Sequence, residues 1–253
     1  MDVQGKVAVV TGGANGIGRA IAEGFLREGA VVSIIDIDQE AGASLAVRHE
    51  NLRFFHGDLV DKAVLDQFVC ALDTAVDCVI NNACISHRGI LSGCSYEAFE
   101  AVLRVGVTAP YYLASRLLQK DLLAPGASIV NIASTRAAQS QADTESYAAA
   151  KGGIVSLTHA LAVSLAGRAR VNCISPGWID TAAYHEGAAM SAHAQQDKTQ
   201  HPAGRVGRCE DIAEMALYLC RSEAGFITGE TVTIDGGMSR LMIYHGDQGW
   251  QLA

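Results

Sequence analysis

Three polar residues in the middle of the chain have the types and the spacing that proton transfer requires. Tyr147 and Lys151 are four residues apart, so in a helix they lie one turn apart on the same face. A cation close to a phenol favours the phenolate, and such a tyrosine can exchange a proton with an alcohol oxygen. Ser134 ends an apolar run thirteen residues before the tyrosine, and its hydroxyl could bind the same oxygen. Alone, the Tyr-x-x-x-Lys pair is weak, because such pairs are common on helix surfaces.

A glycine-rich turn near the N-terminus has the pattern of a dinucleotide-binding loop. The apolar run Val7–Thr11 leads into Gly12-Gly-Ala-Asn-Gly-Ile-Gly18, and a helical pattern follows. In this interpretation Gly12 permits a tight turn, Gly16 allows the backbone to approach a pyrophosphate, and Gly18 allows close packing of helix on strand. The free N–H groups of the helix would then face the phosphates. The alternative is a glycine turn without a ligand, but the position between strand and helix favours the cofactor.

Asp36 suggests which dinucleotide binds, because it ends the second predicted strand 18 residues after Gly18. A carboxylate at this place can accept hydrogen bonds from the adenosine ribose hydroxyls and would repel a 2′-phosphate. Asn15 adds no positive charge to the glycine turn. Both features favour NAD over NADP. The alternative is that Asp36 only caps the next helix, whose start reads Asp38-Gln-Glu40.

The elements that must position these residues are short β-branched runs alternating with helical patterns. Strands are predicted at Val7–Thr11, Val31–Asp36, Leu52–His56, Cys78–Asn81, Ser128–Ile132, Val171–Ile174 and Thr231–Ile234, and helices near 17–28, 40–49, 61–73, 95–123, 146–166 and 209–221. Nearly continuous apolar strands are typical of a parallel sheet covered on both faces. We therefore expect an α/β fold with one doubly wound, Rossmann-type parallel sheet of seven strands, in a single domain over 1–253. The segment 182–206 fits neither pattern and is interpreted as a substrate lid.

Composition excludes several classes of protein. Hydrophobic residues make up 49% of the chain and charged residues 18%, which is too apolar for a disordered chain. A formal charge of −8 without a basic run argues against nucleic acid and anionic membranes as partners. The uncharged run Gly152–Gly167 is too short for a membrane span, and a strand by Lys6 leaves no room for a signal peptide. The seven cysteines form no Cys-x-x-Cys pair or zinc-finger spacing, so we expect reduced core thiols, no metal site and a cytoplasmic protein.

Taken together, these motifs resemble the short-chain dehydrogenase/reductase family over nearly the whole chain. The resembling residues are Thr11-Gly12 with Gly16 and Gly18, Asp58-Leu59, Asn81-Asn82-Ala83, Ser134, Tyr147, Lys151, Pro176-Gly177-Trp178-Ile179-Asp180-Thr181, Gly229 and Asp235-Gly236-Gly237. The resemblance implies that Ser134 and Tyr147 hold the substrate oxygen, that Tyr147 is the acid/base, and that Lys151 binds the nicotinamide ribose and tunes Tyr147.

The resemblance also implies a set of cofactor contacts. Asp58 and Leu59 would hold the adenine, and Ile179 and Thr181 would hold the nicotinamide amide. The complete predicted cofactor-binding set is Gly12, Asn15, Gly16, Ile17, Gly18, Asp36, Asp58, Leu59, Asn81, Ala83, Tyr147, Lys151, Pro176, Gly177, Ile179 and Thr181. Arg136, Gln141 and Glu145 lie between the serine and the tyrosine and could line the substrate pocket, as could Trp178.

Two residues depart from the family pattern. Gly106 stands where the family has an asparagine whose side chain helps to place a water near the lysine; glycine could keep the associated helix kink but not replace the amide. Cys84 stands where the family has a glycine beside the nicotinamide, and we expect it to pack as a small hydrophobe rather than to act as a redox switch.

The predicted function is that of an oxidoreductase transferring a hydride between NAD(H) and a secondary alcohol or ketone. Two alternatives stay open: an NADPH-dependent 3-oxoacyl-type reductase, and, because of Gly106, a catalytically weakened dinucleotide-binding regulatory protein. The helix expected at 146–166 is apolar on nearly every face, so we expect a homo-oligomer, a tetramer or a dimer. The tail at 238–253 carries Trp250 and is expected either to dock on a neighbouring subunit or to fray.

Overall fold

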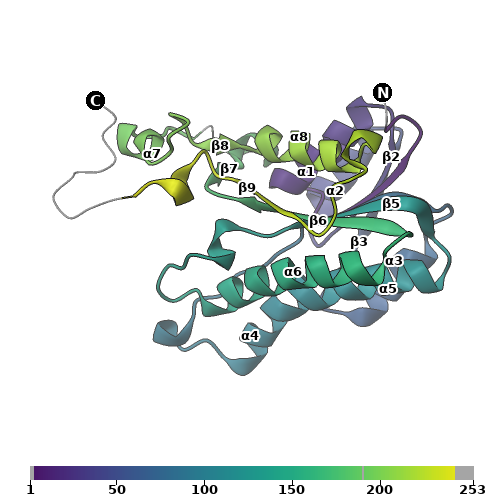
Figure 1. Ribbon diagram of the computed structural model, residues 1–253, viewed down its shortest axis with the longest axis horizontal. Helices are drawn as coiled ribbons and strands as arrows, with labels where there is room; N and C mark the ends of the chain where they lie inside the picture. Colours follow the sequence, from purple (N-terminus) through teal and green to yellow (C-terminus); the bar gives the residue numbers. More distant parts are fainter. Residues whose placement is uncertain (1–2, 190, 243–253) are drawn as a thin grey trace.

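The structure, a computed structural model, describes residues 3–189 and 191–242 (Figure 1). Seven parallel strands form its central sheet in the order β3-β2-β1-β4-β5-β6-β9. Their bounds are β1 Val7–Thr11, β2 Val31–Asp36, β3 Leu52–His56, β4 Val76–Asn81, β5 Leu123–Ile132, β6 Ala169–Pro176 and β9 Thr231–Ile234. The predicted α/β fold with a doubly wound, seven-stranded parallel sheet is confirmed.

Helices cover both faces of this sheet (Figure 1). On one face lie α1 (Gly16–Arg27), α2 (Gln39–Arg48) and α8 (Cys209–Cys220), and on the other lie α3 (Lys62–Cys70), α4 (Tyr96–Leu103), α5 (Ala109–Gln119) and α6 (Glu145–Ser164). Each layer of helices buries its own apolar cluster against the sheet: Ile21, Ile34 and Leu217 belong to the first, and Val79, Leu113 and Ile129 to the second. Within the described residues, no helix has the length and hydropathy of a membrane span.

The helix predicted at 95–123 is divided in the structure. Helix α4 passes into a π-helical turn, Arg104–Thr108, and α5 continues from Ala109. Pro110 explains the change of winding, because it has no N–H to donate to the carbonyl of residue 106. The helix ends at Gln119, and Leu123 already belongs to β5, where it pairs with Val76 of β4. The prediction was therefore wrong about both the continuity and the end of this helix.

The strand order brings the chemically active segments to one edge of the sheet. Its direction of winding reverses between β1 and β4, which are neighbours, and β5 and β6 follow β4. The glycine turn follows β1, Asn82 follows β4, and Ser134 follows β5. Because the carboxyl ends of parallel strands share one edge, these segments meet at the point where ligands bind in open α/β sheets.

The segment 182–206 contains more regular structure than its sequence indicates. A 3₁₀ turn, η4 (Ala182–Tyr184), opens it, and α7 (Gln195–Thr199) follows. The strands β7 (Ile179–Asp180) and β8 (Gly207–Arg208) pair in parallel and join its two ends. Of the tail predicted at 238–253, Met238–Arg240 form a 3₁₀ turn, and residues 243–253, with Trp250, lie outside the described residues.

Asp180 anchors the start of this segment. Its carboxylate accepts hydrogen bonds from the N–H of Ala182 at 3.0 Å, from Oγ of Ser191 at 2.9 Å and from Nε2 of His193 at 2.9 Å. These donors, the backbone N–H first, hold the pKa of Asp180 below its usual range. The carboxylate therefore stays ionised, and it ties η4 and the middle of the segment to β7.

Candidate active site

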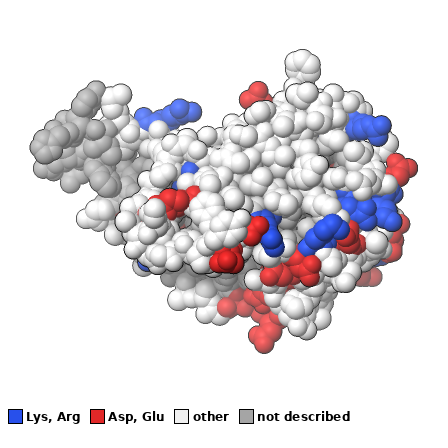
Figure 2. All heavy atoms as spheres, turned by 90° about the horizontal axis from the view of Figure 1, so that it is seen from below, with Lys and Arg blue, Asp and Glu red and all other residues white. Residues whose placement is uncertain are grey.

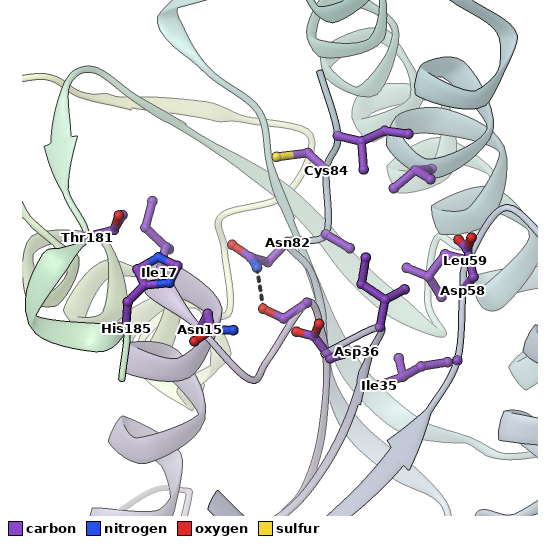
Figure 3. Close-up of a pocket in the computed structure, with 17 residues that line it drawn as sticks. Asn15, Ile17, Ile35, Asp36, Asp58, Leu59, Asn82, Cys84, Thr181 and His185 are labelled. Carbon is purple, nitrogen blue, oxygen red and sulfur yellow. Dashed lines mark hydrogen bonds between the residues drawn. The ribbon is translucent and has the colours of Figure 1, made fainter. Parts of the chain in front are cut away.

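A cavity of about 460 Å³ lies at the sheet edge beside the glycine turn (Figure 3). Nine of the predicted cofactor residues line it: Gly12, Asn15, Gly16, Ile17, Asp36, Asp58, Leu59, Ala83 and Thr181. They come from the ends of β1, β2, β3 and β4 and from the start of η4. Residues far apart in the sequence thus enclose one volume, as a bound dinucleotide requires.

The glycine turn is packed so closely that Gly12 and Gly18 have no room for a side chain. Gly12 has a φ of +62°, and a Cβ added to it would lie 2.9 Å from the Cα of Ala83. A Cβ on Gly18 would lie 2.0 Å from the carbonyl oxygen of Gly12. Asn82 holds the turn, since its Nδ2 donates to the carbonyl of Gly12 at 2.9 Å (Figure 3) and to the carbonyl of Thr11 at 3.1 Å. This backbone-lined hollow at the N-terminus of α1 fits a pyrophosphate.

Asp36 faces the cavity and does not cap α2. Its carboxylate accepts hydrogen bonds from the N–H of Ala14 at 2.9 Å and of Asp38 at 3.0 Å. The cap is Asp38, which accepts from the N–H of Ala41 at 3.0 Å; this bond and one from Asn15 lower its pKa. The capping alternative for Asp36 is therefore wrong. No lysine or arginine is among the described residues that line this cavity.

Asn81, in contrast, points into the core instead of the cavity. It is 4% exposed, and its Nδ2 donates to Oδ1 of Asn131 at 2.8 Å. Asn131 in turn donates to Oγ1 of Thr158 on α6 at 2.9 Å. The side chain predicted as a cofactor contact thus joins β4, β5 and α6, because the alternation of β4 turns it inward and presents the following Asn82 to the glycine turn.

A second cavity, of about 670 Å³, contains the predicted proton-transfer residues. Ser134 and Tyr147 line it together with Gly177, Trp178 and Ile179. Lys151 lies beneath, 3% exposed, with its Nζ 5.4 Å from the centre of the Tyr147 ring. The same Nζ donates to the carbonyl of Ile132 at the end of β5, at 2.8 Å. A hydroxyl, a phenol and a buried ammonium are thereby gathered at one place, the set needed for acid/base chemistry on an oxygen. Pro176 is buried at the end of β6.

The two departures from the family pattern differ in their surroundings. Gly106 lies in the π-helical turn, buried against Ala150 of α6. The turn fits the expectation that glycine keeps a kink at this place. Cys84 is exposed and lines the dinucleotide cavity, so its expected packing as a small hydrophobe is wrong. Four of the other cysteines, Cys78, Cys173, Cys209 and Cys220, are buried as expected.

The structure adds residues that sequence reasoning did not assign to the cavities. His185 of the segment 182–206 lines the dinucleotide cavity, and Gln200 and Met238 line the cavity of Tyr147. Arg136 and Gln141 line the latter as predicted, whereas Glu145 does not; it accepts a hydrogen bond from the N–H of Ile90 at 3.1 Å. In the sequence, only the length of the segment 182–206 indicated that its residues could lie against these cavities. Among the described residues, no group of three His, Cys, Asp or Glu side chains could hold a metal ion.

Known proteins share this fold and much of this sequence. A family model described as enoyl-(acyl carrier protein) reductase matches residues 12–239. An uncharacterized oxidoreductase of Thermotoga maritima is 42% identical over 96% of this chain and 99% of its own length. A 3-oxoacyl-[acyl-carrier-protein] reductase of Chlamydia muridarum is 34% identical over 92% and 97%. An apo SCOR enzyme structure from Clostridium thermocellum superposes with a TM-score of 0.88 at 47% identity, over 97% of each chain.

These similarities and the Rossmann-type sheet define the chain first as an α/β oxidoreductase. Since the family model spans most of its length, the chain belongs to the short-chain dehydrogenase/reductase family.

Proposed function

We propose that this protein is an NAD-dependent dehydrogenase that interconverts a secondary alcohol and a ketone. The observation that carries the proposal is the common cavity of Ser134 and Tyr147, with the ammonium of Lys151 buried 5.4 Å from the phenol ring. This cavity lies at the same sheet edge as the dinucleotide cavity. A protein that only bound dinucleotides would have no need of the three groups.

The residues of the dinucleotide cavity fit the cofactor class that the family uses. In the proposal the backbone of Gly12 to Gly18 holds the pyrophosphate, Asp36 the adenosine ribose, Asp58 and Leu59 the adenine, and Ile179 and Thr181 the nicotinamide amide. When bound, the cofactor accepts a hydride from the alcohol carbon or supplies one to the ketone. The preference for NAD rests on the carboxylate of Asp36 and on the lack of lysine and arginine in the described lining.

The chain's own residues would handle the proton. The hydroxyls of Ser134 and Tyr147 bind the substrate oxygen, and the phenolate of Tyr147 takes the alcohol proton as the carbonyl forms. The ammonium of Lys151 stabilises the phenolate and, held by the carbonyl of Ile132, stays in place through the cycle. In the reverse direction the Tyr147 phenol returns the proton to the ketone oxygen.

The decisive experiment is a steady-state screen of secondary alcohols with NAD and with NADP, followed by absorbance at the reduced nicotinamide band. We expect turnover with NAD that exceeds turnover with NADP. Tight NADH binding without turnover of any alcohol or ketone would contradict the proposal and favour the regulatory alternative.

A second candidate is an NADPH-dependent reductase of 3-oxoacyl thioesters. The description of the family model and the Chlamydia relative favour it. The same assay separates the two, because this candidate requires oxidation of NADPH by a 3-oxoacyl thioester faster than that of NADH. Asp36 opposes it, since a carboxylate beside the ribose repels a 2′-phosphate.

We also propose a homo-oligomer, a dimer or tetramer, in the cytoplasm. Tyr111, Leu118 and Val163 of α5 and α6 are 53%, 37% and 77% exposed. The face drawn in Figure 2 carries a broad area without charged side chains, and elsewhere on this face acidic and basic residues are interspersed. Burial of such a face between copies would remove its apolar side chains from water. Light scattering at the mass of one chain would contradict this.

The segment 182–206 is proposed to act as the substrate lid. His185 at its start lines the dinucleotide cavity, and Gln200 near its end lines the cavity of Tyr147. Glu186 ties it to α2, accepting hydrogen bonds from Arg48 at 2.6 Å and Ser44 at 2.9 Å. Hydrogen exchange in described parts of this segment should slow when cofactor and substrate are both bound.

A further inference from the structure

The cavity around Ser134 and Tyr147 has one charged side chain in its described lining, that of Arg136. The remaining polar side chains, among them Gln141 and Gln200, are neutral, and no aspartate or glutamate is among the described residues that line the cavity. Although the chain has a formal charge of −8, the one charge in the described lining of this cavity is positive, so the cavity favours an anionic substrate. A neutral alcohol or polyol could accept hydrogen bonds from the guanidinium but would leave its charge uncompensated.

The fold places the guanidinium next to the reacting groups. Arg136 lies in the 3₁₀ turn η3 (Thr135–Ala137) directly after Ser134, and its backbone N–H donates to Oγ of Ser134 at 3.2 Å. Its Cζ lies 5.7 Å from the centre of the Tyr147 ring, and its Nη2 donates to Oε1 of Gln141. Ser134 and Tyr147, which hold the carbinol oxygen in the proposed function, therefore face the same cavity as the guanidinium of Arg136.

Nearby carboxylates do not neutralise this cation. Asp143 accepts hydrogen bonds from the N–H groups of Leu91 at 2.9 Å and Ser92 at 3.1 Å, and Glu145 accepts from the N–H of Ile90. In the described part of the chain Arg136 has no ion-pair partner within 4.0 Å, and its only side-chain hydrogen bond is to the neutral Gln141. A guanidinium carries five N–H donors in a planar fork, so most of them remain for a ligand.

We propose, on the basis of the proposed function, that the substrate is a hydroxy acid whose carboxylate is bound by Arg136, a few bonds from the carbinol carbon. A carboxylate is planar and accepts two parallel hydrogen bonds from such a fork. Its single negative charge equals the positive charge that Arg136 supplies in the described lining of the cavity, whereas a phosphate dianion would exceed that charge. Gln141 completes the subsite by fixing the guanidinium.

Arg136 has a competing role that the test must separate, namely electrostatic support of Tyr147 through the face of its ring. A residue with only that role changes kcat and its pH profile for every substrate alike. A carboxylate-binding residue changes kcat/KM for acids and leaves the corresponding amides nearly unaffected.

The experiment compares substrates that differ only in charge. With NAD as cofactor, kcat/KM is measured for 3-hydroxybutyrate and its amide, for lactate and lactamide, and for 3-hydroxybutyl phosphate. The wild-type protein should prefer at least one acid to its amide by about tenfold or more, the effect of one charged hydrogen-bonded pair. In Arg136→Gln this preference should disappear through loss on the acid alone, and Arg136→Lys should keep part of it. Arg53→Gln, an exposed residue paired with Asp73, is the control and should keep all of it.

Equal use of acids and amides, a preference for the phosphate, or an equal loss on acid and amide in Arg136→Gln would each overturn the inference. A second readout separates it from the proposed function: the thermal shift that acid or amide causes in NADH-loaded protein, a combination that cannot react. If no alcohol is turned over, the proposed function fails. An acid-specific shift abolished in Arg136→Gln would still support the carboxylate subsite, and its absence would overturn it.

Discussion

Gly106 and Ala150 approach so closely that a Cβ on Gly106 would lie 2.9 Å from the Cβ of Ala150. Ala150 precedes Lys151 on α6, and Gly106 lies in the π-helical turn between α4 and α5. Any larger side chain at position 106 must therefore push the π-helical turn away from α6 at Ala150, the residue before the proposed catalytic Lys151. This contact decides what restoring the family's asparagine would do.

We expect Gly106→Asn to destabilise the protein by about 1–3 kcal/mol, the usual cost of overpacking, and to lower its activity. The double variant Gly106→Asn with Ala150→Gly should recover part of the lost stability and activity, because it removes the Cβ of Ala150 with which the new side chain would clash. Thermal denaturation and steady-state rates of the three proteins test this. A Gly106→Asn protein of unchanged stability and raised activity would show that the helices separate at little cost and that the missing amide limited proton delivery.

Tyr147→Phe should lower kcat by about 10²–10⁴-fold, the range for loss of a general acid/base, and leave NADH affinity nearly intact. The change removes the transferable proton and almost no volume. Tyr111→Phe, on the exposed surface of α5, is the control and should change neither quantity. If Tyr147→Phe kept a tenth of the activity, the proton would have to come from another group.

Asp36→Ala should weaken NAD binding roughly ten- to hundredfold, since hydrogen bonds to a charged group contribute about 1.5–3 kcal/mol, and should raise the relative use of NADP. Ser95→Ala is the control: it removes the cap of α4, away from the dinucleotide cavity, so it should lower the melting temperature without changing the ratio of kcat/KM for the two cofactors. An unchanged ratio in Asp36→Ala would remove Asp36 from cofactor selection.

Gly18→Ala should abolish or strongly weaken dinucleotide binding, because its Cβ would lie 2.0 Å from the carbonyl oxygen of Gly12, a backbone atom that cannot move without distorting the turn. Gly152→Ala on α6 is the control. Its Cβ would meet only the carbonyl oxygen of Ala137, at 3.9 Å, so the better helix former should stabilise the protein by up to about 1 kcal/mol. Fluorescence titration with NADH compares the two variants, and equal affinities would contradict the prediction.

Asp143 should contribute stability that depends on pH. Hydrogen bonds from the Ser92 hydroxyl and from the N–H groups of Ser92 and Leu91 lower its pKa below the ordinary 3.8. A group with a lowered pKa in the folded state stabilises fully above its unfolded pKa, and this stabilisation is lost as pH falls through the folded pKa. The melting temperature of Asp143→Asn should therefore be below that of wild type at pH 6, and the difference should shrink below pH 3.8.

Asp121→Asn is the control for this experiment. Asp121 has a φ of 56° and Asp143 a φ of 65°, so both substitutions place asparagine in left-handed backbone, which it tolerates. Within the described residues the Asp121 carboxylate has no hydrogen bond, so Asp121→Asn deletes no such contact and should leave the melting temperature at pH 6 close to that of wild type. A parallel decline in both variants would mean that the effect comes from general acid unfolding and not from the contact with Ser92.

The sequence by itself determined the features that depend on neighbours along the chain. The strand β1, the glycine turn and the start of α1 are adjacent, and a helix places Tyr147 and Lys151 on one face by its period alone. The five inner strands β2, β1, β4, β5 and β6 were located in the sequence because strands covered on both faces of a sheet read as largely continuous apolar segments.

Only the tertiary structure decided which side chains face which neighbours. It turned Asn81 into the core and Cys84 into the dinucleotide cavity. It also set Arg136 beside Tyr147 and brought His185 against the glycine turn. These outcomes depend on contacts between segments distant in sequence. They also depend on the alternation of side chains at the end of a strand, where a shift by one residue moves a side chain from the core into the cavity.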